Sequence, residues 1–362
     1  MTKHMFAGAN TPTGFINFFD QIMPLEKAKK RYFLKGSSGS GKSTFIKKIA
    51  AEFEAIGVGT EKFHCANDSS SLDALSICSR GLCIIDATAP HSCDPEIPAA
   101  IDKIIDFAEF LDEQKITRYV DEIKSLLRLK RHYNEKASSY LAAMGNIYKA
   151  ENKTYEIALK KHTLQELLQE WLGILNIHGS SNYTGFDRKL FMSAVTPDGY
   201  VSFAENYFNS YKIYGICKKS RAAASYFLTE LKEKANACGI NTESFYCPFA
   251  PDRLDYLHLP QINTAFTVLG GRFGYNGNVE KKIDMSICID TKILDNIKLS
   301  TSQIEDNTLF DQALDAAVYL MYSSRMHHTK IEEIYSGSMD FNKVKELTEK
   351  TVHELLNEKH FH

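Results

Sequence analysis

The sequence lacks the features that mark membrane-spanning, secreted or nucleic-acid-binding proteins. No apolar stretch approaches the roughly 18 residues of a membrane helix, and the first residues, Met1 to Gly8, lack the apolar core of a signal peptide. The formal net charge of −2 gives no reason to expect broad electrostatic binding to nucleic acid or to a membrane surface. These absences predict a cytoplasmic protein.

The cysteines lack the spacing of a metal or redox site. The chain has eight cysteines but no C-x-x-C pair, which argues against a zinc ribbon and against a thioredoxin-like site. Several lie in apolar runs, such as Cys83 in the run Leu82–Ile85, where a free thiol acts as a small apolar side chain. We therefore expect structural thiols.

One stretch carries a specific chemical motif. Residues 36–43, Gly-Ser-Ser-Gly-Ser-Gly-Lys-Ser, fit the phosphate-binding (Walker A) pattern G-x-x-x-x-G-K-[ST] at every fixed position. A strand-like run, 31–35, precedes them, and a helix-like run, 44–50, follows. Small residues let successive backbone N–H groups point at phosphate oxygens, and the helix adds its positive N-terminal end. The alternative is a flexible Gly/Ser linker, but a linker needs neither Lys-Ser at this spacing nor those flanking elements.

The motif assigns a role to its polar residues. We expect Lys42 to reach the β- and γ-phosphates of a nucleotide and the Ser43 hydroxyl to ligate Mg²⁺. The expected nucleotide-binding residues are Gly36, Ser37, Ser38, Gly39, Ser40, Gly41, Lys42, Ser43 and Thr44.

At 362 residues the chain is long enough for two units, and it repeats itself. Residues 6–15 recur as 191–200, and residues 57–65 recur as 239–247. One shift then places Leu72-Asp73 on Leu254-Asp255 and Ile101-Asp102 on Ile283-Asp284. We predict an α/β fold of two fused copies, residues 1–185 and 186–362, each with a mostly parallel sheet.

Each copy is expected to carry a helical extension. Residues 99–175 contain little Gly or Pro, and apolar residues recur there at helical spacing, which predicts a long helical hairpin projecting from the first unit. Helix-like runs over 309–325 and 342–358 take that part in the second copy. The basic run Arg128–His132 could contact a partner or nucleic acid, but a solvated helix face is the more common role of such a run.

Only the first copy keeps the phosphate-binding pattern. The repeat places Lys218–Ser225 opposite the loop, where all three glycines are gone and Ala224 replaces Lys42. Without glycines the loop cannot easily curl, and without the lysine a γ-phosphate loses its main cation. We expect one functional site and one degenerate copy, in which the remaining basic residues allow at most weak anion binding.

Asp86 is the expected acidic partner of the loop. It ends the apolar run 82–85, and phosphate-binding loops use an acid at the end of a buried strand to hold the metal. The alternative is a helix-capping aspartate. The second copy has Val268 at this position, so both metal-site features are missing from the same copy. We predict Lys42 and Asp86 as catalytic residues and Ser43 and Asp86 as Mg²⁺ ligands.

The group that activates the attacking atom is left open. Ala87 follows Asp86, so the glutamate that many P-loop motor ATPases place there is missing. Asp255 repeats Asp73 in the copy without the loop, which argues against catalysis by Asp73. The candidate activators, each with a structural alternative, are Asp68, Asp73, His91 and Asp94. The candidate arginine fingers, none preferred, are Arg80, Arg118, Arg128 and Arg272.

These segments together resemble a bacterial family of predicted ATPases built from two tandem P-loop NTPase halves. The resemblance is carried by F-x-G-A-x-T-P-x-G-F at residue 6, G-x-x-G-x-G-K-S at 36, H-C-x-x-D-x-x-S-L-D at 64 and I-I-D-x-T-A-P-H at 84, and it covers essentially the whole chain. It implies a cytosolic ATP-binding protein with a P-loop NTPase fold, and it carries the loop from Gly36 to Thr44, with Asp86, onto this sequence. Family members commonly keep a second loop, so its loss here puts in doubt any mechanism that needs two sites.

The function favoured by these observations is Mg²⁺-dependent ATP binding and hydrolysis at the first copy. ATP is preferred to GTP because the N-K-x-D motif of GTPases does not occur in a suitable place. Two alternatives stay open: a phosphotransferase with an acceptor other than water, and a non-enzymatic switch whose nucleotide state moves the helices against a protein partner.

Overall fold

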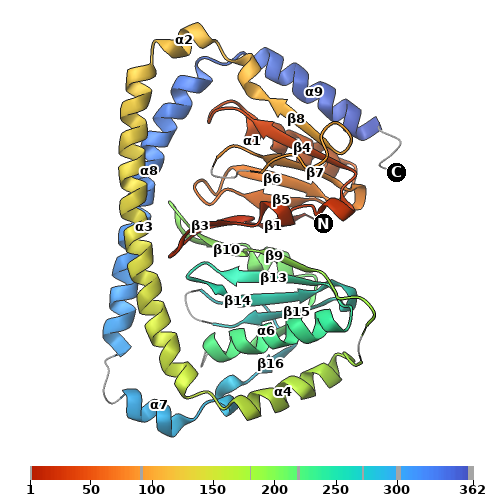
Figure 1. The fold of residues 1–362 in the computed structure, drawn as a ribbon, viewed down its shortest axis with the longest axis vertical. Coiled ribbons are helices and arrows are strands. Elements are labelled where there is room, and N and C mark those ends of the chain that lie inside the picture. Colours follow the sequence, from red (N-terminus) through yellow and green to blue (C-terminus); the bar gives the residue numbers. More distant parts are fainter. Residues whose placement is uncertain are drawn as a thin grey trace.

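A computed structural model gives the fold of residues 2–89, 93–179, 181–217, 221–270, 273–298 and 303–357. Two six-stranded sheets, a four-stranded sheet between them and a pair of long helices beside them make up the molecule (Figure 1). The strand order is β1-β5-β6-β7-β4-β8 in the N-terminal sheet and β9-β13-β14-β15-β12-β16 in the C-terminal sheet. The predicted α/β fold class is confirmed.

Each large sheet is mixed, with a parallel majority. The two pairings of β6, and likewise those of β14, are antiparallel, and the other three pairings in each sheet are parallel. The N-terminal strands are β1 (Lys3–Met5), β4 (Lys30–Lys35), β5 (Glu61–His64), β6 (Leu72–Ile77), β7 (Leu82–Asp86) and β8 (Asp102–Asp106). The C-terminal strands are β9 (Asp187–Leu190), β12 (Lys212–Ile216), β13 (Thr242–Cys247), β14 (Ala250–Leu259), β15 (Thr264–Val268) and β16 (Lys281–Ile283).

The two large sheets share one connectivity and one register over most of their length. Leu34 of β4 pairs with Asp86 of β7, and Ile216 of β12 pairs in the same way with Val268 of β15. The internal repeat seen in the sequence is therefore also a repeat of strand order and strand pairing.

The alignment of the two copies that the sequence predicts is wrong at the last strand of each large sheet. Leu34 also pairs with Ile105 of β8, whereas its counterpart Ile216 pairs with Ile283 of β16. Ile283-Asp284 thus corresponds to Ile105-Asp106 and not to Ile101-Asp102. The side chains of Asp106 and Asp284 support this correction, because each caps the short 3-10 helix that follows its strand.

The first repeated segment joins the two halves. Its copies form the hairpins β2–β3 (Gly8–Thr11, Gly14–Asn17) and β10–β11 (Ser193–Thr196, Gly199–Ser202), which pair through β2 and β10 into one antiparallel sheet. Behind it, apolar side chains of both large sheets share one buried cluster that includes Phe33 of β4 and Phe245 of β13. The halves therefore share part of one hydrophobic core.

Helices cover the outer faces of the sheets and run along one side of the molecule (Figure 1). Helix α1 lies on the N-terminal sheet and α6 on the C-terminal sheet. The α-helices are α1 (Lys42–Ala55), α2 (Glu113–Thr117), α3 (Val120–Ile157), α4 (Lys161–Ile174), α5 (Ala204–Phe208), α6 (Arg221–Ala237), α7 (Thr291–Lys298), α8 (Gln303–Ser336) and α9 (Phe341–Asn357). The 3-10 helices are η1 (Phe19–Gln21), η2 (Leu25–Lys27), η3 (Cys78–Arg80), η4 (Phe107–Phe110), η5 (Pro260–Ile262) and η6 (Met285–Cys288).

The long helices α3 and α8 cross from one half to the other, so that α4, the last helix of residues 1–185, packs on the C-terminal sheet and α9, the last helix of the chain's described part, packs on the N-terminal sheet. Helix α3 ends at the C-terminal half, where Trp171 of α4 packs on Tyr214 and Phe266 of that sheet. Helix α8 runs the other way, and Val344 and Leu355 of α9 are buried against α1 and the N-terminal sheet. Residues 99–175 therefore do not form the predicted projecting hairpin. They contain β8, and the 38 residues of α3 extend for about 57 Å, enough to reach the opposite half.

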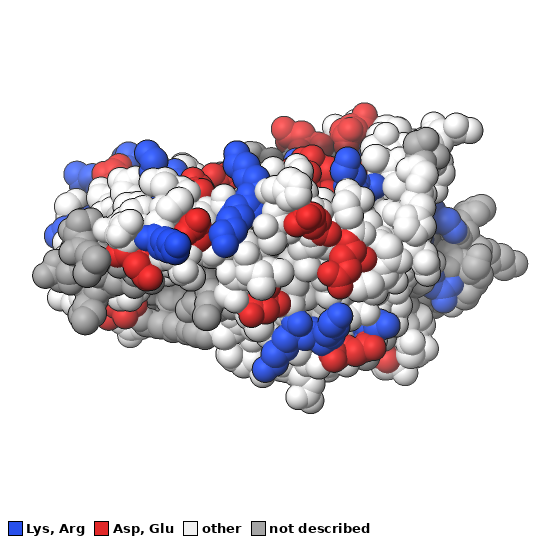
Figure 2. All heavy atoms as spheres, turned by 90° about the horizontal axis from the view of Figure 1, so that it is seen from below, with Lys and Arg blue, Asp and Glu red and all other residues white. Residues whose placement is uncertain are grey.

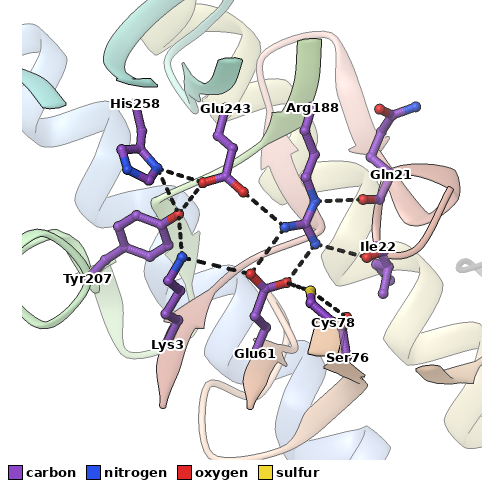
Figure 3. A network of polar contacts seen from close by, with 10 residues as sticks. All are labelled: Lys3, Gln21, Ile22, Glu61, Ser76, Cys78, Arg188, Tyr207, Glu243 and His258. Atoms are coloured by element: carbon purple, nitrogen blue, oxygen red, sulfur yellow. Dashed lines mark hydrogen bonds and ion pairs between the residues drawn. The ribbon is translucent and has the colours of Figure 1, made fainter. Parts of the chain in front are cut away.

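A buried polar network also links the two halves (Figure 3). Arg188 of β9 donates to Glu61 of β5 at 2.8 Å and to Glu243 of β13 at 3.1 Å. His258 and the hydroxyl of Tyr207 bond the other oxygen of Glu243. Burial lowers the pKa of Arg188, but the two carboxylates outweigh it and hold this pKa well above its usual value. The guanidinium thus stays charged and ties a strand of one sheet to a strand of the other.

The distribution of charged side chains on the surface agrees with the small formal net charge of −2. On the face shown in Figure 2, basic and acidic side chains are interspersed. Within the described ranges, no helix combines the length and the apolar content that crossing a membrane requires.

Candidate functional site

The glycine-rich loop, residues 36–43, leads from β4 into α1. Its glycines have φ angles of +135° at Gly36, +74° at Gly39 and +95° at Gly41. L-residues rarely adopt these values, because a Cβ would crowd the backbone, so each glycine of the motif is required by the local backbone. Gly41 ends the loop, and α1 begins at Lys42 with the N–H groups of its first turn facing the loop side.

The amine of Lys42 lies inside the curve of this loop. Its Nζ donates to the carbonyl oxygens of Gly36 at 2.9 Å and Ser37 at 2.7 Å, and it is 3.5 Å from the hydroxyl of buried Ser40. Burial lowers the pKa of Lys42, and the nearby carboxylate of Asp86 opposes that shift. The side chain is thus placed where phosphate oxygens could replace the carbonyls as its partners.

Asp86 lies beside the loop, as the sequence predicts. It ends β7 next to β4, and its Oδ2 is 3.7 Å from Nζ of Lys42. Its Oδ1 accepts the N–H of Thr88 at 3.0 Å, and the Thr88 hydroxyl donates to the Gly36 carbonyl at 3.2 Å. Asp86 is followed by a bend at Thr88 and a turn at Ala89, and it caps no helix among the described residues, which argues against the helix-capping alternative.

The Ser43 hydroxyl has a structural partner, and the same contact occurs in the second half. The N–H of Leu72 donates to Ser43 Oγ at 3.0 Å, and in the second half the N–H of Leu254 donates to Ser225 Oγ at 3.0 Å. This contact ties the first helix to the neighbouring strand in both halves, so it does not depend on a phosphate site. It leaves Ser43 one oxygen lone pair and its proton for a ligand.

The available donors fit Mg²⁺ held jointly with phosphates. Ser43 and Asp86 offer hard oxygens, and the described residues hold no cluster of three or more His, Cys, Asp or Glu side chains that could cage a metal alone. Mg²⁺ in proteins usually keeps several waters and uses one or two protein oxygens together with substrate phosphates. The site therefore suits a metal that arrives with a nucleotide.

The remaining loop residues differ in exposure. Ser40 is buried, whereas Ser37 and Ser38 are partly exposed and Thr44 is exposed on the first turn of α1. In the second half, Ala224 and Val268 occupy the positions of Lys42 and Asp86 and are both buried. Residues 218–220, which the repeat places opposite the start of the glycine-rich loop, lie outside the described residues.

The predicted activators fare unequally. Asp68 accepts hydrogen bonds from the hydroxyls of Ser70 at 2.8 Å and Ser71 at 2.5 Å, so it organises its own turn. Burial and the charge of Asp86 raise the pKa of Asp73 well above its usual value. Asp94 is 87% exposed and 3.6 Å from Lys35. His91 lies outside the described residues.

No contact with the loop is seen for the three candidate arginines that lie in the described residues. Arg80 lies in η3, between the end of β6 and the start of β7, and therefore at the edge of the sheet opposite the loop. Arg118 and Arg128 are exposed, and Arg272 lies outside the described residues. Two residues beyond Arg128, however, Lys130 turns inward and its Nζ is 2.9 Å from Nδ1 of His328 on α8. The basic run 128–132 is thus only partly the solvated face that the sequence suggests.

Helices α8 and α9, from the far end of the chain, cover the glycine-rich loop. A Cβ placed on Gly39 would lie 2.5 Å from the carbonyl oxygen of Glu332, and one on Gly41 would lie 3.4 Å from Val344. Arg325, His328 and Glu332 recur at helical spacing on one face of α8. Sequence reasoning missed these residues because they are almost 300 positions from the loop and belong to no motif.

Charged groups on this face of α8 interact with the loop and its surroundings. Burial and then the charge of Lys130 lower the pKa of His328 to about 4, and Lys42 acts in the same direction. Burial and the charge of Asp68 raise the pKa of Glu332, whereas Lys130 and Lys42 oppose that shift. Arg325 forms two 2.8 Å hydrogen bonds with Asp198 of the β10–β11 turn, which also accepts from Ser69 at 3.3 Å.

Two surface hollows, of about 570 and 480 Å³, lie around the turn between α8 and α9. They are lined by residues from η4 to the start of α3, and by residues at the end of α8, around Gly337 and at the start of α9. Neither is lined by residues of the glycine-rich loop, so we place the candidate site by its chemistry and not by these hollows.

Comparison of the chain with models of protein families, with curated proteins and with solved structures found no match.

Proposed function

We propose that this chain is a P-loop NTPase that binds ATP with Mg²⁺ at residues 36–44 and hydrolyses it, and that its C-terminal half is a degenerate P-loop unit. The single observation that carries the proposal is the loop itself. Three glycines in left-handed conformations curl it around the amine of Lys42, and Asp86 lies 3.7 Å from that amine. The second half has the same strands but an alanine and a valine at these two positions.

The side chains suggest how phosphates are held. The amine of Lys42 exchanges the Gly36 and Ser37 carbonyls for oxygens of the β- and γ-phosphates, where its charge stabilises the transition state. The first-turn N–H groups of α1 add further positive potential. Ser43 and Asp86 hold the metal, which when bound neutralises negative charge on the phosphate oxygens.

A binding assay with matched variants tests this function. ATP with Mg²⁺ is expected to raise the Tm of the full chain, and Lys42→Ala is expected to abolish the shift and reduce phosphate release by about 100-fold or more. Lys47→Ala, which removes an exposed lysine on the same helix, is the control and should behave like the wild type. No stabilisation of the wild type by ATP, GTP or ADP would refute the proposal.

A further inference from the structure

Helix α8 carries a series of polar side chains where its backbone packs on the glycine-rich loop. The Glu332 carbonyl lies against Gly39, so this turn of α8 rests directly on the loop. One turn earlier, His328 Nε2 is 3.5 Å from Glu332 Oε1, and His328 Nδ1 is 2.9 Å from Nζ of Lys130 on α3. Lys130 of α3 and His328 and Glu332 of α8 therefore form a continuous series of polar contacts that ends at the turn packed on the loop.

The donor and acceptor capacity of the three side chains determines which ring nitrogen of His328 carries the proton. A lysine amine can only donate, so Nδ1 of His328 accepts from Lys130, and the proton of the neutral ring is on Nε2. Nε2 is then the protonated ring nitrogen, and it lies 3.5 Å from Oε1 of Glu332, an electrostatic contact that is longer than a typical hydrogen bond. The imidazole thus lies against one oxygen of the Glu332 carboxylate.

The face of α8 is also anchored on both sides of these residues. Arg325 is bonded to Asp198, which is bonded in turn to Ser69 in the segment after β5. Beyond Glu332, Ser338 and Asp340 bond the backbone before α2 and at η4. A helix held at both ends keeps the turn that carries Glu332 at a fixed position relative to the loop, which the placement of a catalytic base requires.

We propose that Glu332 is the general base of the hydrolytic reaction, with His328 and Lys130 as its positioning residues. The proposal rests on the proposed function. It supplies the glutamate that many P-loop ATPases have directly after the metal-binding aspartate, a position that Ala87 occupies here. It places the base on α8, a helix of the second copy.

The proposed step is an in-line displacement. A water molecule gives one proton to Glu332 while its oxygen forms a bond to the γ-phosphorus. The bond from that phosphorus to the β–γ bridging oxygen breaks, and ADP leaves with the electron pair. The proton on Glu332 then passes to inorganic phosphate or solvent, which restores the carboxylate.

The decisive experiment compares Glu332→Gln with Glu333→Gln in the full chain. Glutamine keeps the shape of the side chain, and Glu333 is the adjacent, exposed residue, so the two variants differ mainly in which face of α8 loses a charge. Glu332→Gln is expected to reduce kcat by about 100-fold or more and to leave the Kd for ATP within about threefold of wild type. Glu333→Gln is expected to change neither value.

Other outcomes overturn the assignment. A kcat for Glu332→Gln within about threefold of wild type means that Glu332 is not the base. Loss of ATP binding by this variant means that its role is structural, because a base is not needed for binding. Absence of ATP binding by the wild type is a separate result, which refutes the proposed function and this inference with it.

The positioning residues have a readout of their own in the pH profile of kcat. The charged and titratable groups that act on Glu332 are Asp68, Lys130, Lys42 and His328. The Lys130 charge lowers the pKa of Glu332, so Lys130→Met is expected to move the acid limb of the profile to higher pH. His328→Gln, which keeps one acceptor and one donor, is expected to retain more kcat than His328→Ala at an unchanged KM. An unmoved acid limb and equal losses in both histidine variants would contradict this positioning role.

Discussion

The contact between α8 and the glycine-rich loop can be tested by adding one methyl group. Gly39 has φ +74°, and a Cβ on it would lie 2.5 Å from the carbonyl oxygen and 3.1 Å from the Cα of Glu332. An alanine in this backbone conformation costs about 1–2 kcal/mol. Forcing an extra methyl group against packed backbone adds about 1–3 kcal/mol, because the atoms in the way belong to the backbone of α8 and not to a flexible side chain that could move aside. Gly39→Ala is therefore expected to lower the free energy of unfolding by about 2–5 kcal/mol.

Gly57 provides the matched control. Its φ is +78°, almost that of Gly39, but no heavy atom lies within 4 Å of its added Cβ. Gly57→Ala should therefore show the conformational cost alone, about 1–2 kcal/mol. Urea unfolding followed by circular dichroism measures both variants, and hydrogen exchange should show faster opening of the α8 turn around Glu332 only in Gly39→Ala. Equal destabilisation by the two variants would refute the packing of α8 on this loop.

Three further predictions concern the rest of the fold. Arg188→Met removes the buried guanidinium that Glu61 and Glu243 share, leaves the more distant Lys3 as the remaining lysine or arginine charge beside them, and should lower the free energy of unfolding by about 3–5 kcal/mol. Lys212→Met, at an exposed pair with Glu280, should leave the urea midpoint unchanged. Trp171→Ala should cost about 3–5 kcal/mol and speed hydrogen exchange in β12 and β15 more than in β4 and β7, because Trp171 packs on the C-terminal sheet; equal effects in both sheets would contradict the helix exchange. Burial lowers the pKa of both His64 and His328 to about 4, so from about pH 6.5 down to 4 the unfolded chain binds more protons, and stability should fall by up to about 1.4 kcal/mol per pH unit for each histidine. A urea midpoint that does not change between about pH 7 and pH 5 would contradict this, and His64→Gln should reduce the slope.

The part of the site that could be predicted from the sequence is the part with local causes. Gly36, Gly39 and Gly41 are needed for positive φ angles, and that need is visible in any sequence that has the motif. Asp86 could be placed because an apolar run that ends in an acid is visible in the sequence. In a parallel sheet, the end of that strand lies beside the end of the strand that leads into the loop. The register of the repeat was also readable, since Leu34 and Ile216 make equivalent pairings.

The errors arose where distant packing decides the structure. The helical spacing around Ile123 and Leu126 was real, but an apolar stripe does not tell which surface will cover it. The helix that follows α3 packs on the opposite sheet, and a pattern read along one unit cannot show this. The misplaced Ile101-Asp102 has a related cause: the first copy has extra residues before β8, and only the pairing of Leu34 with Ile105 shows where they are.

The helix exchange also explains how a half without a phosphate loop can matter to the half that has one. Helix α8 starts in the C-terminal half, and its last turns carry His328 and Glu332 to the loop of the N-terminal half. Helix α9 then completes the hydrophobic core beneath α1, where Val344 is buried. Ala224, which the repeat places opposite Lys42, is buried in the core of its own half and takes no part in this contact. The C-terminal helices do take part, because α8 covers the glycine-rich loop and α9 closes the core on which α1 packs.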